Sequence, residues 1–328
     1  MHLPSTRGPV SEAVIATVRS GDAAPPPPAD LDAEVLLGED VQLALWVAHE
    51  LGYRGFDDAT PDAERDVDLL RWRHAVEDEL EQHLRASTAE AVASAQEQGR
   101  DVADRLRSLV DDGPSTPLAR HLQRHATREE VLTFLRERSV YHLKESDPHA
   151  AALAHLDGPA KVALAELLYD EYGGGRPERL HSHLYAEALE AAGLDAGYGA
   201  YVEEVGASTL LSNNVMSLFA RQRRLRGALI GHLAAFEATS TDPCRRIAAG
   251  IERVGLPDAV AAYFHEHVEA DAVHEQVVLG DICGSAVAAD PALEDDVLFG
   301  AAVCLQVDAA ASDVLYAELT ATPARAAG

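Results

Sequence analysis

The chain has 328 residues, 47% of them hydrophobic, so it can bury the core of one large domain or two modest ones. Its 55 acidic and 27 basic side chains give a net charge of −28, which argues against nucleic acid or an anionic membrane as a partner. Residues 1–21 lack the apolar core of a secretory signal, and no apolar run reaches the roughly 18 residues of a membrane span. The three cysteines, Cys244, Cys283 and Cys304, form no CxxC pair and indicate buried thiols of a reducing compartment. We therefore expect a cytoplasmic protein.

The predicted elements begin after an N-terminal tail. Residues 1–30 end in four consecutive prolines, Pro25–Pro28, which predict a disordered tail or a stiff spacer instead of a packed element. Residues 31–112 predict an N-terminal helical extension, either an accessory domain or an oligomerisation arm. Its expected helices cover Gln42–Leu51, Leu69–Gln98 and Asp101–Val110. The turn-rich segment Asp111–Pro117 marks a soft boundary after it.

Residues 113–328 predict a compact second domain with about eight helices. Thr127-Arg-Glu-Glu130 has the spacing of a capping box, in which two side chains satisfy free backbone N–H groups at a helix start. Four acids stand just ahead of a proline, as at many helix N-termini: Asp147-Pro148, Asp157-Gly-Pro159, Asp242-Pro243 and Asp290-Pro291. Valine and isoleucine never alternate with polar residues for long enough to predict a sheet. The predicted fold class is all-α.

The segment Ala261–Leu279 carries the most informative pattern, His267-Val-Glu-Ala-Asp271-Ala-Val-His274, with no internal glycine or proline. At about 100° per residue, Asp271 lies roughly 40° around the helix from His267, and His274 lies roughly 20° the other way. Two imidazoles and a carboxylate on one narrow face suit iron, manganese or zinc. The alternative is a solvated polar face, or core histidines with satisfied hydrogen bonds.

A second polar group flanks a glycine triplet. Glu171 ends an apolar helical stretch, Gly173–Gly175 interrupt it, and His181 follows a helix restart at Pro177. An uninterrupted helix would place Glu171 and His181 roughly 80° apart, but the glycines can bend the path so that both point inward. A plain interhelical turn is the alternative. The pair Glu178-x-x-His181 has the spacing of di-iron carboxylate bundles, so Glu178 competes with Glu171 as the partner of His181.

Two further acids and a basic cluster complete the candidate residues. Glu237 lies in an apolar stretch, so it must be at the solvent edge or paired, since burying a lone carboxylate costs several kcal/mol. Glu145, viewed alone, is an ordinary helix-terminal acid. The basic cluster would either face a carboxylate substrate or form a basic helix surface; it consists of Arg221, Arg223 and Arg224.

Together these residues resemble the haem-oxygenase-like di-iron oxidases and oxygenases, which are often described as iron-containing redox enzymes. The resemblance covers about residues 127–319, and its most specific part is the motif His267–His274. The stretch Asp170–His181 is similar to the family's early Glu…His element, and the separation between Glu237 and His267 also fits the family pattern. Residues 40–56 are similar to the N-terminal region of longer members.

The resemblance implies a haem-oxygenase-like helical bundle that holds two Fe(II) ions per chain in place of haem. One iron would be held by Glu171, His181 and His274, with Glu145 as an extra carboxylate. The other would be held by Glu237, His267 and Asp271. Either Glu171 or Glu237 would bridge the two ions, which makes these the candidate catalytic residues. Oxygen and imidazole ligands do not distinguish Fe/Fe from Mn/Fe.

The function implied is a non-haem di-iron oxygenase or oxidase with O₂ as co-substrate. Its substrate would be a small amino-acid-, amine- or fatty-acid-like metabolite, and the reaction N-oxygenation or oxidative C–C cleavage or desaturation. An external electron donor is a possible partner. The long helix expected over Leu69–Gln98 makes a homodimer plausible.

Two other functions compete with this expectation. One is a metal-binding or iron-storage protein without an organic substrate, which would oxidise Fe(II) and turn over no metabolite. The other is a metal-free, thiaminase-like enzyme of the same bundle shape. That enzyme would not need His267, Asp271 and His274 together, and would carry a nucleophilic cysteine on its pocket wall.

Overall fold

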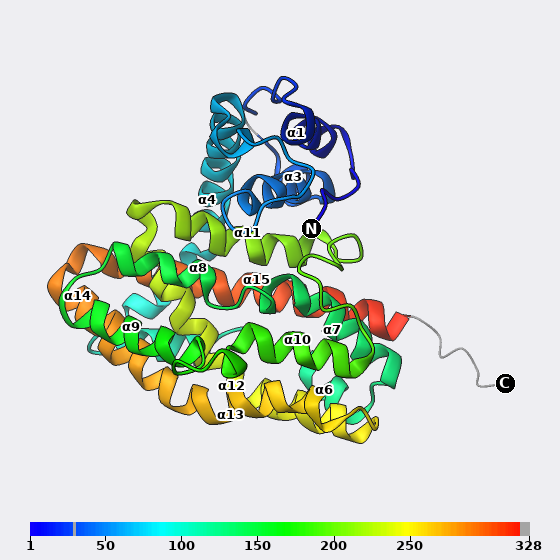
Figure 1. The fold of residues 1–328 in the computed structure, drawn as a ribbon. Helices are drawn as coiled ribbons and strands as arrows, with labels where there is room; N and C mark the ends of the chain where they lie inside the picture. Colours follow the sequence, from blue (N-terminus) through cyan, green and yellow to red (C-terminus); the bar gives the residue numbers. More distant parts are fainter. Residues whose placement is uncertain (29–30, 322–328) are drawn as a thin grey trace.

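The computed structural model describes residues 1–28 and 31–321, apart from the side chains of residues 269–273, and over these residues it is helical and contains no strand. This confirms the predicted all-α class. The N-terminal helices are α1 (Pro9–Ser20), α2 (Ala33–Leu36), α3 (Glu39–Glu50), α4 (Val67–Gln96) and α5 (Val102–Asp111). Helices α3, α4 and α5 match the expected helices of the extension to within a few residues, whereas α1 and α2 were not expected. Helices α1, α3 and the first part of α4 lie over α11 (Figure 1).

The remaining helices form the main body of the bundle. They are α6 (Leu118–Arg124), α7 (Arg128–His142), α8 (Asp147–Ala150), α9 (Gly158–Glu171), α10 (His181–Ala192), α11 (Ala207–Arg221), α12 (Arg226–Arg253), α13 (Asp258–Gln276), α14 (Ser285–Ala289) and α15 (Glu294–Ala321). Short 3₁₀ turns are η1 (Ala63–Arg65), η2 (Ala151–Ala154), η3 (Pro177–Arg179), η4 (Arg223–Leu225) and η6 (Pro291–Leu293). A π-helical segment, η5 (Val277–Gly284), follows α13.

The prediction of a disordered tail over residues 1–30 is wrong for residues 9–20, which form α1. Val14, Ile15 and Val18 on this helix are buried, and α1 packs against α3. The Asp40 carboxylate on α3 accepts hydrogen bonds from the backbone N–H groups of Val10 and Ser11. The four prolines predict an unpacked segment, but the apolar spacing before them is that of an amphipathic helix.

Helix starts were predicted with mixed success. Thr127 and Glu130 form the expected capping box at the start of α7, and α9 begins after Asp157 as expected. The prediction that Asp242-Pro243 starts a helix is wrong, because Pro243 lies inside α12. Asp242 instead pairs with Arg246 one turn later, at 2.6 Å. Packing of α12 against both α13 and α15 outweighs the single backbone hydrogen bond that proline removes.

Helices α12 and α15 approach very closely, and this contact positions α12 in the centre of the bundle. A Cβ atom at Gly231 would lie 1.9 Å from the Val297 carbonyl oxygen, and one at Gly300 would lie 1.9 Å from the Ala228 carbonyl oxygen. Only glycine permits two backbones to pass at this distance. Glu237 lies on α12 less than two turns beyond Gly231.

One apolar stretch in the described residues, Pro291–Ala321, meets the length and composition of a membrane span. Of its most apolar window, 67% is buried inside the structure, as in the core helix of a globular bundle. One hydrophobic cluster runs from Leu3 through the extension to Val307 on α15, and a second is formed mainly by residues of α6, α7, α10 and α13.

Candidate metal centre

Glu171 and His181 meet across the glycine triplet. Glu171 is the last residue of α9 and His181 is the first residue of α10. Gly173, Gly174 and Gly175 have φ values of 83°, 61° and 81°, a region that residues with side chains rarely adopt. The resulting reversal brings His181 Nδ1 to 3.2 Å from Glu171 Oε2, with both residues buried. The triplet is thus more than an interhelical turn.

The structure separates the two acids that compete for His181. Glu171 has 3% of its surface exposed and lies beside the imidazole. Glu178 is exposed in η3, and it belongs to neither of the groups described below. Glu171 is therefore the partner of His181, although Glu178 has the more familiar sequence spacing.

His267 and His274 on α13 both face the interior, as the helical spacing predicted. His267 Nε2 lies 3.4 Å from Glu145 Oε1. His274 Nδ1 lies 3.4 Å from Glu171 Oε1 and 3.3 Å from Glu237 Oε2. Both histidines are buried, so the interpretation as a solvated polar face is wrong. The side chain of Asp271 lies outside the described residues.

Glu145 lies in the turn between α7 and α8, and the structure buries it at 5% exposure. The local pattern alone suggested an ordinary helix-terminal acid, and the interior position shows that this reading is wrong. The next residue, Ser146, has φ of 66°, the one positive φ among the described residues other than glycine. Ser146 Oγ donates a hydrogen bond of 2.7 Å to Glu171 Oε2, so this strained residue ties the turn to α9.

The six described candidates form two groups of three buried side chains. One contains Glu145, His181 and His267, and the other contains Glu171, Glu237 and His274. The predicted division between two irons differs, since it joined His181 to His274 and His267 to Glu237. Seven residues at 1.5 Å of rise place His267 and His274 about 10 Å apart along α13. Each histidine therefore faces a different set of partners, which the narrow angular spacing does not reveal.

The donor atoms present fit iron. Within each group, one oxygen or nitrogen from every residue lies within 4.8 Å of the others. Bonds of roughly 2 Å to a common ion require such closeness. His181 Nδ1 is buried and makes no hydrogen bond of good geometry, which suits a nitrogen that ligates a metal. Carboxylates and imidazoles without a thiolate suit Fe(II) or Mn(II) better than structural zinc.

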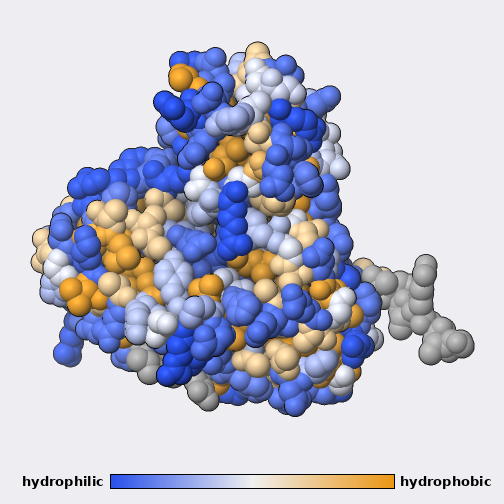
Figure 2. Space-filling view, in the orientation of Figure 1, coloured by the Kyte–Doolittle hydropathy of each residue, from blue (hydrophilic) through white to orange (hydrophobic). Residues whose placement is uncertain are grey.

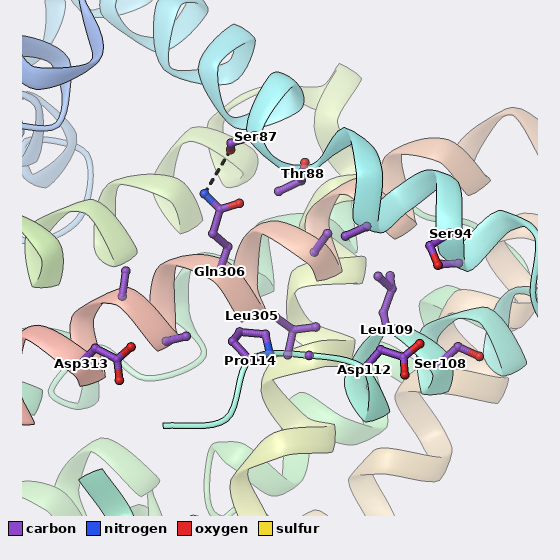
Figure 3. Close-up of a pocket in the computed structure, with 16 residues that line it drawn as sticks. Ser87, Thr88, Ser94, Ser108, Leu109, Asp112, Pro114, Leu305, Gln306 and Asp313 are labelled. Carbon is purple, nitrogen blue, oxygen red and sulfur yellow. Dashed lines mark hydrogen bonds between the residues drawn. The ribbon is translucent and has the colours of Figure 1, made fainter. Parts of the chain in front are cut away.

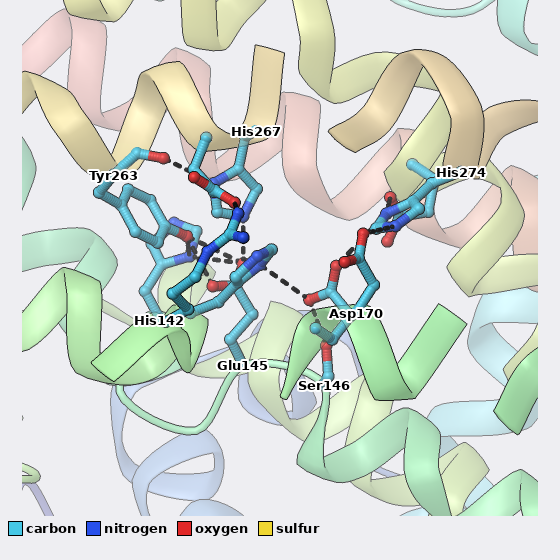
Figure 4. A network of polar contacts seen from close by, with 12 residues as sticks. His142, Glu145, Ser146, Asp170, Tyr263, His267 and His274 are labelled. Carbon is cyan, nitrogen blue, oxygen red and sulfur yellow. Dashed lines mark hydrogen bonds and ion pairs between the residues drawn. The ribbon is translucent and has the colours of Figure 1, made fainter. Parts of the chain in front are cut away.

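Further residues orient these side chains, and the sequence reading missed them. Tyr263 donates from its hydroxyl to Glu145 at 2.7 Å, and its carbonyl oxygen accepts from His267 Nδ1 at 2.8 Å. Asp170 Oδ2 lies 3.0 Å from His274 Nε2. Such partners fix the ring orientation of metal-binding histidines. Figure 4 shows Tyr263 and His267 around Glu145, with His274 beside Asp170.

Two sequence signals pointed toward these partners. Tyr263 stands one helical turn before His267, and Asp170 is the direct neighbour of Glu171. Neither signal is specific enough to be used without the fold. Nothing in the local sequence indicates the strained backbone of Ser146.

Proton affinities in the cluster shift in the directions expected for a site that attracts cations. Burial by itself would raise the pKa of Glu145, but the imidazoles of His267 and His142 hold that pKa well below its usual range. Burial would lower the pKa of His274, but the carboxylates of Glu237 and Glu171 raise it to about 9. The negative charge of the site's carboxylates thus favours either a proton on imidazole or a metal ion.

One large cavity does not coincide with the cluster. It measures about 510 Å³ and lies between α4, α5 and α15, with Ser87 and Gln306 hydrogen-bonded at its edge (Figure 3). A small cavity of about 40 Å³ is lined in part by Tyr141 and Phe236. Tyr141 is close enough to Glu145 and Glu171 that burial and these negative charges raise its pKa. None of the six candidate ligands lines this small cavity.

The basic cluster lies elsewhere, and two of the three cysteines are inert; the third, Cys244, is only partly buried, so the prediction of a buried thiol is wrong for it. Arg221 donates to the His49 carbonyl oxygen, and Arg224 pairs with Glu81, so both bind the N-terminal extension. Cys283 and Cys304 are buried, and burial raises the pKa of Cys283 to about 12. A thiol of this kind is a poor nucleophile, which disfavours the thiaminase-like alternative.

Comparison with known proteins agrees with the geometry. Residues 132–309, more than half of the chain, match the family of iron-containing redox enzymes. A 132-residue stretch is 30% identical to a nitrosourea synthase from Streptomyces achromogenes subsp. streptozoticus; it covers 40% of this chain and 28% of that protein. The chain thus spans well under a third of the relative it matches. Buried carboxylates and imidazoles, a haem-oxygenase-like all-α fold and the family match lead to one conclusion: the chain belongs to the iron-containing redox enzyme family.

Proposed function

We propose that this protein is a non-haem di-iron oxygenase or oxidase that uses two Fe(II) ions and O₂ on a small metabolite. One observation carries the proposal: two groups of three buried side chains that could hold a metal ion are adjacent, with Glu171 Oε2 within 3.2 Å of His181 in the other group. Two adjacent sites of mixed carboxylate and imidazole character favour two divalent ions over one.

The residues divide into ligands and supports. Glu145, His181 and His267 would hold one ion, and the second would be held by Glu171, Glu237 and His274. Asp271 remains a proposed ligand of this centre. Because Glu171 faces both groups, we propose it as the bridging carboxylate. Bound iron would supply the electrons for reduction of O₂, and an external donor would restore Fe(II) between turnovers.

We favour N-oxygenation of an amine- or amino-acid-like substrate over C–C cleavage or desaturation. The name nitrosourea synthase denotes a product with an oxidised nitrogen, and that relative shares 30% identity over 132 residues with this chain.

The first experiment is an anaerobic Fe(II) titration with Mössbauer quantification, followed by exposure to O₂ under stopped-flow absorbance. We expect two irons per chain and a transient visible band. The variant His267→Ala should bind about one iron while keeping its helicity, since it removes a ligand of only one group. The exposed Glu178→Ala serves as the control and should keep both irons. A single tightly held ion without redox activity, or full iron content in His267→Ala, would overturn the proposal.

A further inference from the structure

The turn that carries Glu145 is held from outside the bundle, by the N-terminal extension. Its residue Lys144 is almost fully buried, with 1% of its side chain exposed, and its Nζ lies 2.9 Å from Glu50 Oε2 on α3. Glu50 is completely buried. The partners are 94 residues apart in sequence, so this pair joins the extension to the α7–α8 turn.

Further contacts surround the same ion pair. Arg54, just beyond α3, donates from Nη2 to the Leu143 carbonyl oxygen at 3.0 Å. Its guanidinium lies 4.2 Å from the ring centre of Tyr198, whose hydroxyl donates to Glu50. The Lys144 ammonium lies 4.5 Å from the ring centre of Tyr53. The turn is thus held at both its backbone and its lysine.

Successive residues of this turn contact different parts of the molecule. Lys144 contacts the extension, Glu145 contacts His267, and Ser146 donates to Glu171. Because Ser146 has positive φ, the turn is not in its preferred local conformation, and contacts on both sides must maintain it. A shift of Lys144 would therefore be transmitted directly to Glu145.

Stability alone is a weak reason for such an ion pair. Removing two charges from water is costly, and replacing a buried pair by apolar residues of similar size is often neutral or stabilising. A fixed ion pair does, however, define the position of the segment that carries it. We infer that Glu50, Lys144 and Arg54 are positioning residues through which the N-terminal extension sets the place of Glu145 in the iron centre. This inference rests on the proposed function.

The test compares iron affinity in two buried acids of the same extension. Glu50→Gln breaks the contact with the turn. Its matched control is Glu77→Gln, which removes an equally buried acid whose partner, His49, is also on α3. Fe(II) affinity is measured by chelator competition, the ferrous ligand field by near-infrared magnetic circular dichroism, and folding by thermal unfolding.

We expect Glu50→Gln to weaken binding of one of the two irons by about 10- to 100-fold and to change its ligand-field bands, as loss of a supporting residue does at metal sites. The control should lose comparable thermal stability and keep both affinities. If Glu50→Gln does not fold, the pair Glu50→Gln/Lys144→Met removes both charges. Arg54→Met removes the hydrogen bond to Leu143 and the contact with Tyr198, and leaves the Lys144–Glu50 ion pair in place. Each should weaken the same iron.

Two results overturn the inference alone: parental affinity in all these variants, or equal weakening by Glu77→Gln. Absence of iron binding in the parent protein would instead refute the proposed function, and the inference with it. Fe(II) titration of the parent protein therefore distinguishes a failure of this inference from a failure of the proposed function.

Discussion

Protons and metal ions compete for the same atoms at the centre of this protein. The raised pKa of His274, about 9, means that at neutral pH its imidazole carries a proton when no metal is bound. A metal ion must displace that proton, so iron binding should release protons and weaken as pH falls. The same negative charge that favours the proton also favours metal cations.

A second pair of histidines has lowered pKa values, in contrast to the raised pKa of His274. His149 Nε2 and His232 Nδ1 lie 3.2 Å apart, and burial lowers the pKa of each to about 3. In the unfolded chain each titrates near 6.5, so below that pH the unfolded state binds protons that the folded state does not. The contribution of these two neutral histidines to the free energy of unfolding is complete above pH 6.5 and is lost as pH falls toward 3.

We predict a loss of about 4 kcal/mol of unfolding free energy between pH 7 and pH 5 from this pair, at roughly 2 kcal/mol for each histidine. Urea unfolding at the two pH values measures it. In the variant His149→Gln/His232→Gln this part of the pH dependence should vanish. An equally steep pH dependence in that variant would show that other groups are responsible.

A residue of the candidate metal centre could be predicted from the sequence where it belongs to a local sequence pattern. His267 and His274 share a helix, so their common face follows from periodicity alone. Glu145 was placed only by family resemblance, because its burial depends on a turn held by residues far away in sequence. Tyr263 and Asp170 support the ligands through distances that only the folded chain defines.

At the scale of elements, the crossing of α12 and α15 determines where Glu237 lies. A methyl group at Gly300 would overlap the Ala228 carbonyl oxygen at 1.9 Å, and backbone cannot move aside as a flexible side chain can. We therefore predict that Gly300→Ala lowers the unfolding free energy by about 3 kcal/mol or more. The helices would have to separate for the methyl group to fit.

Gly280 in the π-helical segment provides the control for this prediction. A Cβ atom there meets nothing within 4 Å. Gly280→Ala should be neutral or slightly stabilising, since alanine restricts the unfolded chain. Chemical denaturation of both variants measures the difference, and similar stability for the two would contradict the close-approach account.

Most helices were predictable because their apolar spacing and caps are local. The exceptions share a cause. Pro243 remains inside α12 because packing on two sides outweighs a local preference, and α1 was hidden by the proline run that follows it. The approach of Glu171 to His181 also depended on three consecutive positive φ angles, which glycine allows but does not require.

At the scale of the whole molecule, the extension shares one of two hydrophobic clusters with part of the main body. Buried Leu43, Trp46 and Leu80 belong to the same cluster as Leu229 and Val303. Hydrophilic residues cover much of the face seen in Figure 2, in keeping with the net charge of −28. The boundary predicted at residues 112–113 thus falls within a continuous interior.

We predict that residues 113–328 alone will not form a stable fold. Removing the extension would expose the apolar surface beneath it and leave the buried Lys144 without Glu50. Circular dichroism and size-exclusion chromatography should show reduced helicity or aggregation. A monomeric fragment with native helicity and a cooperative thermal transition would refute this expectation.

The π-helical segment η5, which follows α13, affects where this chain can lose a residue without disturbing the fold. A π-helical segment holds more residues per turn than an α-helix, so Val277–Gly284 contains surplus chain beside the iron centre. Loss of one residue there lets the backbone tighten to α-helical spacing while the helices on both sides keep their facing. Loss of one residue between His267 and His274 would instead rotate one histidine by about 100° against the other. Natural variation in length should therefore be tolerated just after the second histidine and excluded just before it.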